Sequence, residues 1–348
     1  MTGRAVRPSP SARPVLSLRS AVPARLRSLL QRVDPAAGVD TVAGVAERVA
    51  VLLSAGVPAP AAWSHVGGRH GDPSTDLPSN ARAEQPVLDA AVGAAARGES
   101  VSAAIGEALE RHPSAAAEWS VLGAAWSVAV ASGAPLAASL LTLAAALRDE
   151  AQLRREVQSA LAGPLASARL VTALPLIAVG FGVLLGFDTF AVLFGDPVGI
   201  ACVVLGGALL WAGRAWSMRL ARRASRTSAG AGLDLELLAI AMSGGASIER
   251  ARGLVADSLA AHRLLTDDRR AHEVIALAER AGAPVAELLR AEAFRARRIA
   301  RADGAARAAA LGARLMLPLG ACVLPAFVLL GVVPLLVSVV SGTLGGAA

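Results

Sequence analysis

The chain has 348 residues, of which 54% are hydrophobic and 18% are charged, and its mean hydropathy is +0.53. A soluble protein of this length is rarely so apolar, so the charges must be gathered in soluble segments that alternate with membrane spans. The net charge is +7, and every basic residue other than histidine is an arginine. Only 3% of the chain is aromatic, which argues against a surface that stacks on nucleic-acid bases.

The N-terminal segment, residues 1–38, is rich in Arg, Pro, Ser and Ala, a composition that predicts a disordered tail. Its one apolar patch, Val15–Leu18, lies between Arg13 and Arg19 and is shorter than the core of a signal peptide. We therefore expect the tail to remain in the cytoplasm as a solvated segment. Contact with anionic lipid through its arginines is the alternative.

The segment 39–164 carries apolar residues at helical spacing, without any strand signal, and predicts a cytoplasmic bundle of about six short helices. The first helix is expected to end at a turn with Gly56 and Pro58, because glycine accepts a left-handed conformation and proline stops a helix. Residues Gly67–Pro86 are rich in Gly, Pro, Ser, Asp and Asn, and they predict a surface loop.

The last helix of this bundle has an apolar stripe at Leu136, Leu140, Leu143 and Leu147, and its opposite face is charged. Two interpretations of the charged face remain open: a solvated surface with ion pairs between residues four apart, or a docking surface for a partner protein. The candidate docking residues are Arg148, Asp149, Glu150, Arg154, Arg155 and Glu156.

Residues 165–214 predict a transmembrane hairpin with both ends in the cytoplasm. Leu170–Phe187 contains no charge over roughly 18 residues, which is close to the length that crosses a bilayer core. Asp188 and Asp196 bracket a short turn, and Pro197–Gly213 is again uncharged. Arginines follow the second run, as the positive-inside rule expects of a cytoplasmic end: Arg214, Arg219, Arg222, Arg223 and Arg226.

The segment 215–312 is predicted to be a second cytoplasmic helical domain that repeats the first. Leu52–Val57 matches Ala241–Ala246, and Ala131–Leu136 matches Arg280–Val285, in the same order along the chain. Further matches lie at the two membrane entries. We expect tight turns between packed helices at the shared positions, which are Gly56, Pro58, Gly133, Pro135, Gly245, Gly282 and Pro284.

Residues 313–341 predict a third span, since no charge occurs from Leu315 to the end of the chain. Pro318, Pro325 and Pro334 interrupt this run, but a proline in a bilayer kinks a helix rather than forbidding it. One long, kinked or tilted helix suits the run better than a hairpin, because no polar turn divides it. The predicted topology places the N-terminus in the cytoplasm and the C-terminus outside.

The motifs of catalysis and energy conversion are missing from the sequence. Without lysine there is no Walker A site for ATP and no Schiff-base chemistry. We expect no enzyme activity and no catalytic, cofactor-binding or metal site. The predicted spans also lack the buried ionisable residues that mark transport pathways, so any energy for the process would come from a separate ATPase.

Two related helical domains, a hairpin between them and a third span resemble the F family of type II secretion inner-membrane proteins. The resemblance covers about residues 40–341. Its motifs are a Leu-Leu-x-x-Gly-x-Pro turn at Leu52–Pro58, a Gly-x-Pro-Leu turn at Ser132–Leu136, the charged helix Leu140–Glu156 and the membrane entry Ala168–Pro175. The Arg-Asp-Glu and Arg-Arg-Glu run is most similar to the tight-adherence (Flp) pilus branch.

This resemblance implies a scaffold without catalytic activity in the bacterial cytoplasmic (inner) membrane. The implied partners are a cytoplasmic secretion or pilus ATPase, pilin-like subunits, another F-family membrane protein or a second copy of the chain, and the lipid bilayer. Two other functions compete with it: a membrane-anchored regulator with helical sensor domains, and a permease subunit beside its own ATPase. A permease would need polar residues within its spans and usually more spans.

Overall fold

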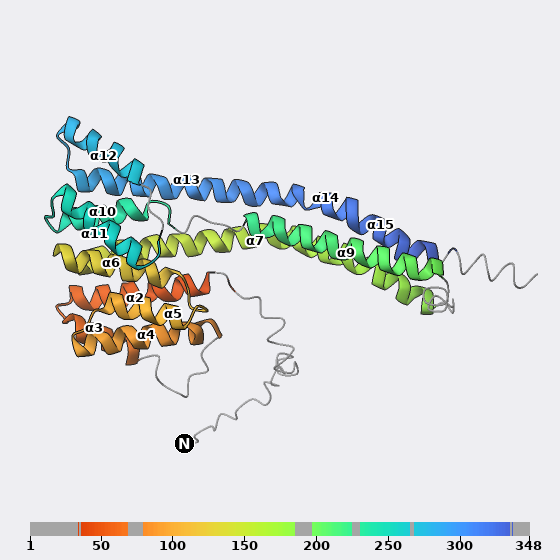
Figure 1. Cartoon of the computed structure of the whole chain (residues 1–348), viewed down its shortest axis with the longest axis horizontal. Coiled ribbons are helices and arrows are strands. Elements are labelled where there is room, and N and C mark those ends of the chain that lie inside the picture. The colour runs from red at the N-terminus through yellow and green to blue at the C-terminus, as the bar shows by residue number, and fades with distance from the viewer. Residues whose placement is uncertain are drawn as a thin grey trace, which may run out of the picture. The chain divides into compact units, whose positions relative to one another are not determined.

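The computed structural model shows a helical chain (Figure 1). It describes residues 34, 36–68, 79–184, 197–224, 230–264, 268–334 and 336, and within these ranges no strand occurs. The predicted N-terminal tail lies outside the described residues up to residue 33. The same holds for the turn of the predicted hairpin, with Asp188 and Asp196, and for the end of the predicted third span after residue 336.

Helices occupy most of the chain before the predicted hairpin turn. They are α2 (Ala37–Ser54), α3 (Ala59–Gly68), α4 (Ser79–Arg97), α5 (Val101–Arg111), α6 (Glu118–Ser132) and α7 (Leu136–Leu184). The helices after that turn are α9 (Pro197–Ala224), α10 (Leu233–Ser243), α11 (Ile248–Ala261), α12 (Asp268–Ala281) and α13 (Val285–Arg314). The C-terminal apolar run continues as α14 (Met316–Pro318), η2 (Leu319–Val323), α15 (Leu324–Phe327) and η3 (Val328–Val332).

Capping residues explain where two of the shorter helices begin. The Ser100 hydroxyl accepts a hydrogen bond from the N–H of Ala103 at 3.2 Å and so caps α5. At the start of α11, the Ser247 hydroxyl accepts one from the N–H of Arg250 at 3.3 Å. Both serines have the extended backbone of an N-cap, so these helix starts follow from local sequence.

The predicted loop at Gly67–Pro86 is shorter than expected, because α4 begins at Ser79 and contains Pro86. The prediction was therefore wrong over the last part of this range. Its composition suggested a loop, but Glu84 in the same stretch is buried and bonds to the start of α6. A tertiary contact of this kind overrides a local turn preference.

The two segments predicted as cytoplasmic domains share one hydrophobic core. α6 packs against α10 and α11, and α7 packs against α13. The largest fully buried side chains come from both segments: Trp63, Ile105, Trp119, Leu122, Leu140, Leu235, Leu237, Leu259 and Leu289. The helices α2–α6 and α10–α12 thus form one bundle around the first halves of α7 and α13 (Figure 1).

Two long helices lead out of this bundle. α7 has 49 residues and is therefore about 70 Å long. α13 has 30 residues and passes directly into the C-terminal apolar run. The two helices hold each other beyond the bundle through a small apolar cluster of Leu153, Val157, Leu161, Leu311 and Leu315. α7, α9 and the run from α13 to η3 then lie side by side (Figure 1).

Two helices of the described chain are long and apolar enough to cross a membrane: Gly199–Leu220 and Val285–Val332. The second includes α13, so its apolar part is the C-terminal run. The first predicted span, Leu170–Phe187, corresponds to the end of α7, but its last three residues fall outside the described ranges. The structure thus presents an all-helical protein with two candidate membrane helices.

The prolines of the C-terminal run do not end the helix within residues 316–334. Two π-helical segments, η2 and η3, precede Pro325 and Pro334 respectively. Proline cannot donate its i→i−4 hydrogen bond and its ring crowds the preceding carbonyl, so a locally widened helix accommodates it. The described part of this run therefore contains no hairpin turn.

Candidate functional site

The four glycines predicted to form turns end α2, α6, α10 and α12. Gly56, Gly133, Gly245 and Gly282 have φ of 82°, 73°, 84° and 62°, a region that strongly favours glycine. Pro58 precedes α3, Pro135 precedes α7 and Pro284 is the N-cap residue of α13. The helix order places these turns at the end of the bundle from which α7 and α13 begin, away from the apolar runs (Figure 1).

Most side chains on the charged face of α7 contact other helices of the same chain. Its side chains form ion pairs with three other helices, which neither interpretation from sequence anticipated. The pairs are Arg148 with Glu47 of α2, Arg155 with Asp40 of α2, Arg154 with Glu118 of α6, and Asp149 with Arg301 of α13. Glu156 accepts a hydrogen bond from the Gln152 amide on the same helix. The face therefore ties α7 to the bundle.

Arg154 is the most enclosed cation on this face. Its side chain is 21% exposed and contacts Glu118, which is 6% exposed, and Glu150, at 3.0 Å. Burial disfavours the charged guanidinium, but the charges of the two carboxylates outweigh it and raise the pKa of Arg154. The Arg154 guanidinium therefore remains charged, and α6 and α7 are joined by an ion pair.

A second ionic contact joins α10 to α13. The Arg297 guanidinium lies 3.2 Å from the Glu236 carboxylate, with side chains 20% and 3% exposed. Both residues line a cavity of about 60 Å³ at the junction of α6, α7, α10 and α13, together with Glu118, Glu150 and Arg301. This charged junction is one place where the helices before and after the predicted hairpin meet through polar groups.

The C-terminal end of α11 is fixed to α5 and α6 by polar contacts that the sequence did not indicate. His262 Nε2 is 2.7 Å from the Ser102 hydroxyl, and the Ser258 hydroxyl donates to the Ala124 carbonyl at 3.1 Å. The His262 ring lies against Gly123, where a Cβ would come within 2.5 Å of Cε1. These contacts span the two segments, so only the folded structure could reveal them.

His262 should make this contact sensitive to acid. Burial lowers the pKa of the imidazole below its usual 6.5, while Glu110 and Arg263, paired at 2.7 Å, line the same pocket. Because the pKa of His262 is lowered in the folded state, the neutral imidazole contributes to the stability of the fold above pH 6.5. This contribution is lost as the pH falls and the ring takes up a proton. We expect thermal stability in detergent to drop between pH 7 and pH 5, and to drop less steeply in His262→Gln; identical pH profiles would contradict this role.

Glu84 is a further residue that the sequence did not single out. Its carboxylate accepts hydrogen bonds from Trp119 Nε1 at 2.6 Å and from the N–H of Ala116 at 3.0 Å. Burial raises the pKa of this carboxyl, although both hydrogen bonds act in the opposite direction. Glu84 thereby holds α4 against the start of α6.

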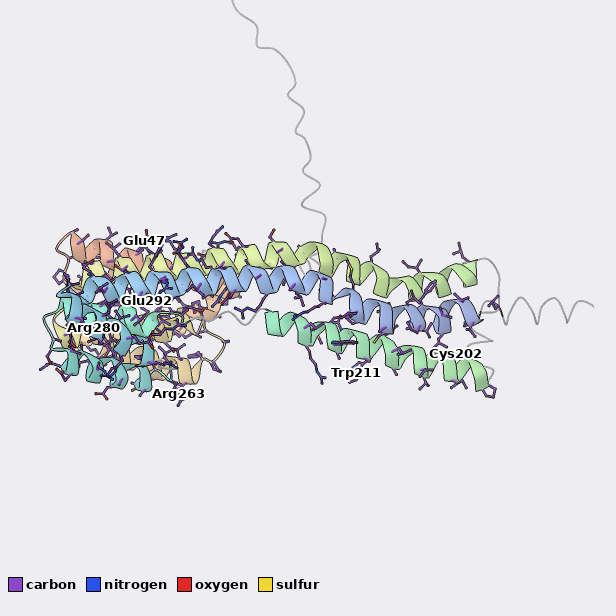
Figure 2. All side chains as sticks on the ribbon, turned by 90° about the horizontal axis from the view of Figure 1, so that it is seen from above. Glu47, Cys202, Trp211, Arg263, Arg280 and Glu292 are labelled. Carbon is purple, nitrogen blue, oxygen red and sulfur yellow. The ribbon has the colours of Figure 1, made fainter. Side chains whose placement is uncertain are left out.

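The candidate membrane helices pack through glycines of α9. A Cβ at Gly206 would come within 2.5 Å of the Leu330 side chain in η3, and one at Gly213 within 3.0 Å of the Cys322 Cβ in η2. Small residues let membrane helices approach closely. On the other side, Trp211 is 74% exposed and points away from the neighbouring helices (Figure 2).

Gly206→Val is therefore expected to separate α9 from the C-terminal run. The added side chain overpacks a close contact, which costs about 1–3 kcal/mol. The neighbouring Gly207→Val is the matched control, because nothing lies within 4 Å of that position. Thermal stability of the two variants in detergent checks this: equal Tm values would contradict the packing described here.

Comparison with known protein families gives a match over part of the chain. Residues 45–184 match the family model described as Type II secretion system (T2SS), protein F. No curated protein and no solved structure matches the chain. The matched segment runs from within α2 to the end of α7, so it contains most of the first half of the bundle, the charged face and most of the first predicted span. The match supports the F family, and with the two apolar helices it points to an inner-membrane protein.

Proposed function

We propose that this chain is a non-enzymatic inner-membrane platform of a secretion or pilus machine, in the tight-adherence branch of the F family. The observation that carries the proposal is the continuity of α7 and α13. Each helix begins inside the charged bundle and leads without a described break into an apolar run. A stiff helix that joins a cytoplasmic bundle to a membrane span can transmit movement between the two.

An internal repeat supports the two-domain architecture of the family. Aligning the glycine turns pairs α2 with α10, α3 with α11, α6 with α12 and α7 with α13. In this alignment Glu47 corresponds to Glu236, and Arg148 corresponds to Arg297. Both form an ion pair between equivalent helices, α2–α7 and α10–α13. The same ion pair thus recurs at the same place in each repeat.

Buried positions follow the same alignment. Residues of α2 and α7 that are buried correspond to buried residues of α10 and α13. These pairs are Ala46 and Leu235, Val49 and Leu238, Ala50 and Ala239, Leu140 and Leu289, Ala144 and Ala293, and Leu147 and Ala296. Equivalent burial and an equivalent ion pair favour duplication over chance similarity in an alanine-rich sequence.

The proposed topology has three spans, a hairpin formed by the end of α7 with α9, and a single C-terminal helix. Arginines at the cytoplasmic ends and the helical course of residues 316–334 support it. Both repeats then lie on the cytoplasmic side, where a hexameric ATPase would act. The chain has no lysine for a Walker A site, so the energy would come from that partner.

The outward members of the charged face are the proposed contact with the ATPase. Arg148 and Asp149 have side chains 56% and 47% exposed, and Glu156 is also exposed. Arg154 and Glu150 are turned into the bundle instead. An ATPase that pushes on the outer charges of α7 would move the span at the other end of the same helix. Pilin-like subunits would meet the apolar runs.

Affinity capture tests this function. The tagged full chain is purified from gently solubilised membranes and its partners are identified by mass spectrometry. Recovery of a secretion ATPase with pilin-like subunits or a second F-family protein is expected. Recovery of a solute-binding protein with a transporter ATPase would favour the permease, and recovery of neither set would favour the regulator. ATP hydrolysis by the purified chain alone would also contradict a passive platform.

A further inference from the structure

The second repeat has a groove between α10, α11 and α12. Its volume is about 330 Å³, within the range of pockets that hold ligands. Leu238, Val255 and Leu259 form its buried floor, and Ala256 lies exposed at its opening. An apolar floor beneath an open mouth on a helical bundle is a place where another apolar surface can pack.

The repeat alignment identifies the equivalent surface in the first repeat. There α3 takes the place of α11: Ala62 and Val66 correspond to Ala251 and Val255, and all four are buried. The position of Ala256 is taken by Gly67. The two helices therefore turn the same face to the core, which places Gly67 and Ala256 at equivalent positions beside that face.

In the first repeat the side of α3 that carries Gly67 is covered by α4. A Cβ at Gly67 would come within 2.8 Å of the Val92 side chain, so α4 lies directly on α3 at this point. Trp63, also on α3, is buried and packs edge-on against Trp126 of α6 with ring centroids 5.4 Å apart. In the second repeat the position of Trp63 is occupied by Arg252, which lines the groove.

The second repeat has no helices equivalent to α4 and α5. The turns at Gly56 and Gly133 are 77 residues apart, whereas those at Gly245 and Gly282 are only 37 apart. The missing length is about that of α4 and α5 with their connections, since α11 is followed directly by α12. The groove thus lies on the side of α11 that corresponds to the α4-covered side of α3.

We propose that this groove binds an amphipathic helix of a partner protein, seated on α11 as α4 is seated on α3. The proposal rests on the internal repeat and goes beyond the platform function. The chemistry of the bound helix is given by α4, whose buried stripe consists of small and branched apolar residues: Val87, Leu88, Ala91, Ala94 and Ala95. A partner helix with such a stripe packs its apolar side chains against the exposed Ala256 at the mouth of the groove.

A peptide of residues 79–111, containing α4 and α5, is the probe for this groove. It is labelled with a fluorophore and titrated with the purified full chain in detergent, and binding is followed by anisotropy. We expect saturable binding to the wild-type chain. Ala256→Trp fills the mouth of the groove and should weaken binding by about tenfold or more, a loss of about 1.4 kcal/mol.

Ala261→Trp is the matched control for groove filling. Residue 261 is exposed, lies on the same helix and is about 140° further round it. This variant should bind the peptide as the wild type does. Both variants alter exposed alanines, and an unchanged Tm for each would show that the bundle remains folded. Absence of saturable binding to the wild type, or equal loss in both variants, would overturn the proposal.

Disulfide cross-linking locates the bound peptide. Val92→Cys in the peptide should cross-link to Ala256→Cys in a chain whose Cys202 and Cys322 are replaced by alanine, because Val92 contacts the equivalent Gly67. Equal cross-linking to Ala261→Cys would overturn the proposed seat. Failure of the peptide to bind would leave the platform function intact, since affinity capture tests that function separately.

Discussion

Gly244→Ala is expected to lower the stability of the bundle by about 3 kcal/mol, the upper part of the range for overpacked sites. A Cβ at this position would come within 2.3 Å of the Ser132 carbonyl oxygen and within 2.9 Å of the Ala134 nitrogen. These are backbone atoms of the turn that ends α6, so they cannot rotate away as a side chain can. Differential scanning calorimetry or a thermal melt in detergent should show a Tm decrease on the order of 6 °C.

Gly253→Ala is the matched control for this change. Gly253 lies within α11, nothing is within 4 Å of its Cβ position, and its φ is not positive. Alanine favours a helix interior over glycine by about 1 kcal/mol, so this variant should be slightly more stable than the wild type. Similar losses of stability in Gly244→Ala and Gly253→Ala would contradict the close contact between the turns after α6 and α10.

Arg297→Ala is expected to destabilise the chain by about 3–5 kcal/mol, the range for breaking a buried ion pair. The change leaves the Glu236 carboxylate, 3% exposed, without its cation, and Glu236 Oε1 already has no hydrogen-bond partner among the described residues. A charge buried in this way is penalised heavily. Adding Glu236→Gln to the variant should restore part of the lost stability, because it removes the uncompensated charge.

The proposed repeat supplies the control for this prediction. Arg148 occupies the equivalent position, but its side chain is 56% exposed and that of Glu47 is 41% exposed. Exposed ion pairs contribute about 0–1 kcal/mol, so Arg148→Ala should have little effect on Tm. The outer position of Glu47 is visible on α2 (Figure 2). Equal losses for Arg148→Ala and Arg297→Ala would contradict the difference in burial between the two repeats.

The features that sequence predicts well are local ones. The leucine stripe of α7 is an example: Leu140, Leu143 and Leu147 recur at helical spacing, and all three are buried. The positive φ of a turn glycine is likewise a local requirement, which a single residue must meet. Periodicity and turn chemistry act over a few residues, so both can be seen without the fold.

The features that sequence missed depend on contacts between distant residues. Ser102 and His262 are 160 positions apart, and Glu84 bonds to a tryptophan 35 positions away. The charged face of α7 shows the same limit. Its spacing indicated a solvated or docking surface, whereas Arg148 and Arg155 find their partners on α2 more than 100 positions earlier. No local pattern identifies such a partner.

Membrane topology shows whether α7 and α13 connect one cytoplasmic bundle to the membrane. Reporter enzymes that are active on one side only are fused after Gly195, at Gly230 and at Ala348. The account predicts an outside signal at Gly195 and Ala348 and an inside signal at Gly230. An inside signal at Ala348 would mean that the last apolar run is a hairpin, and an outside signal at Gly230 would separate the two repeats and contradict the shared bundle.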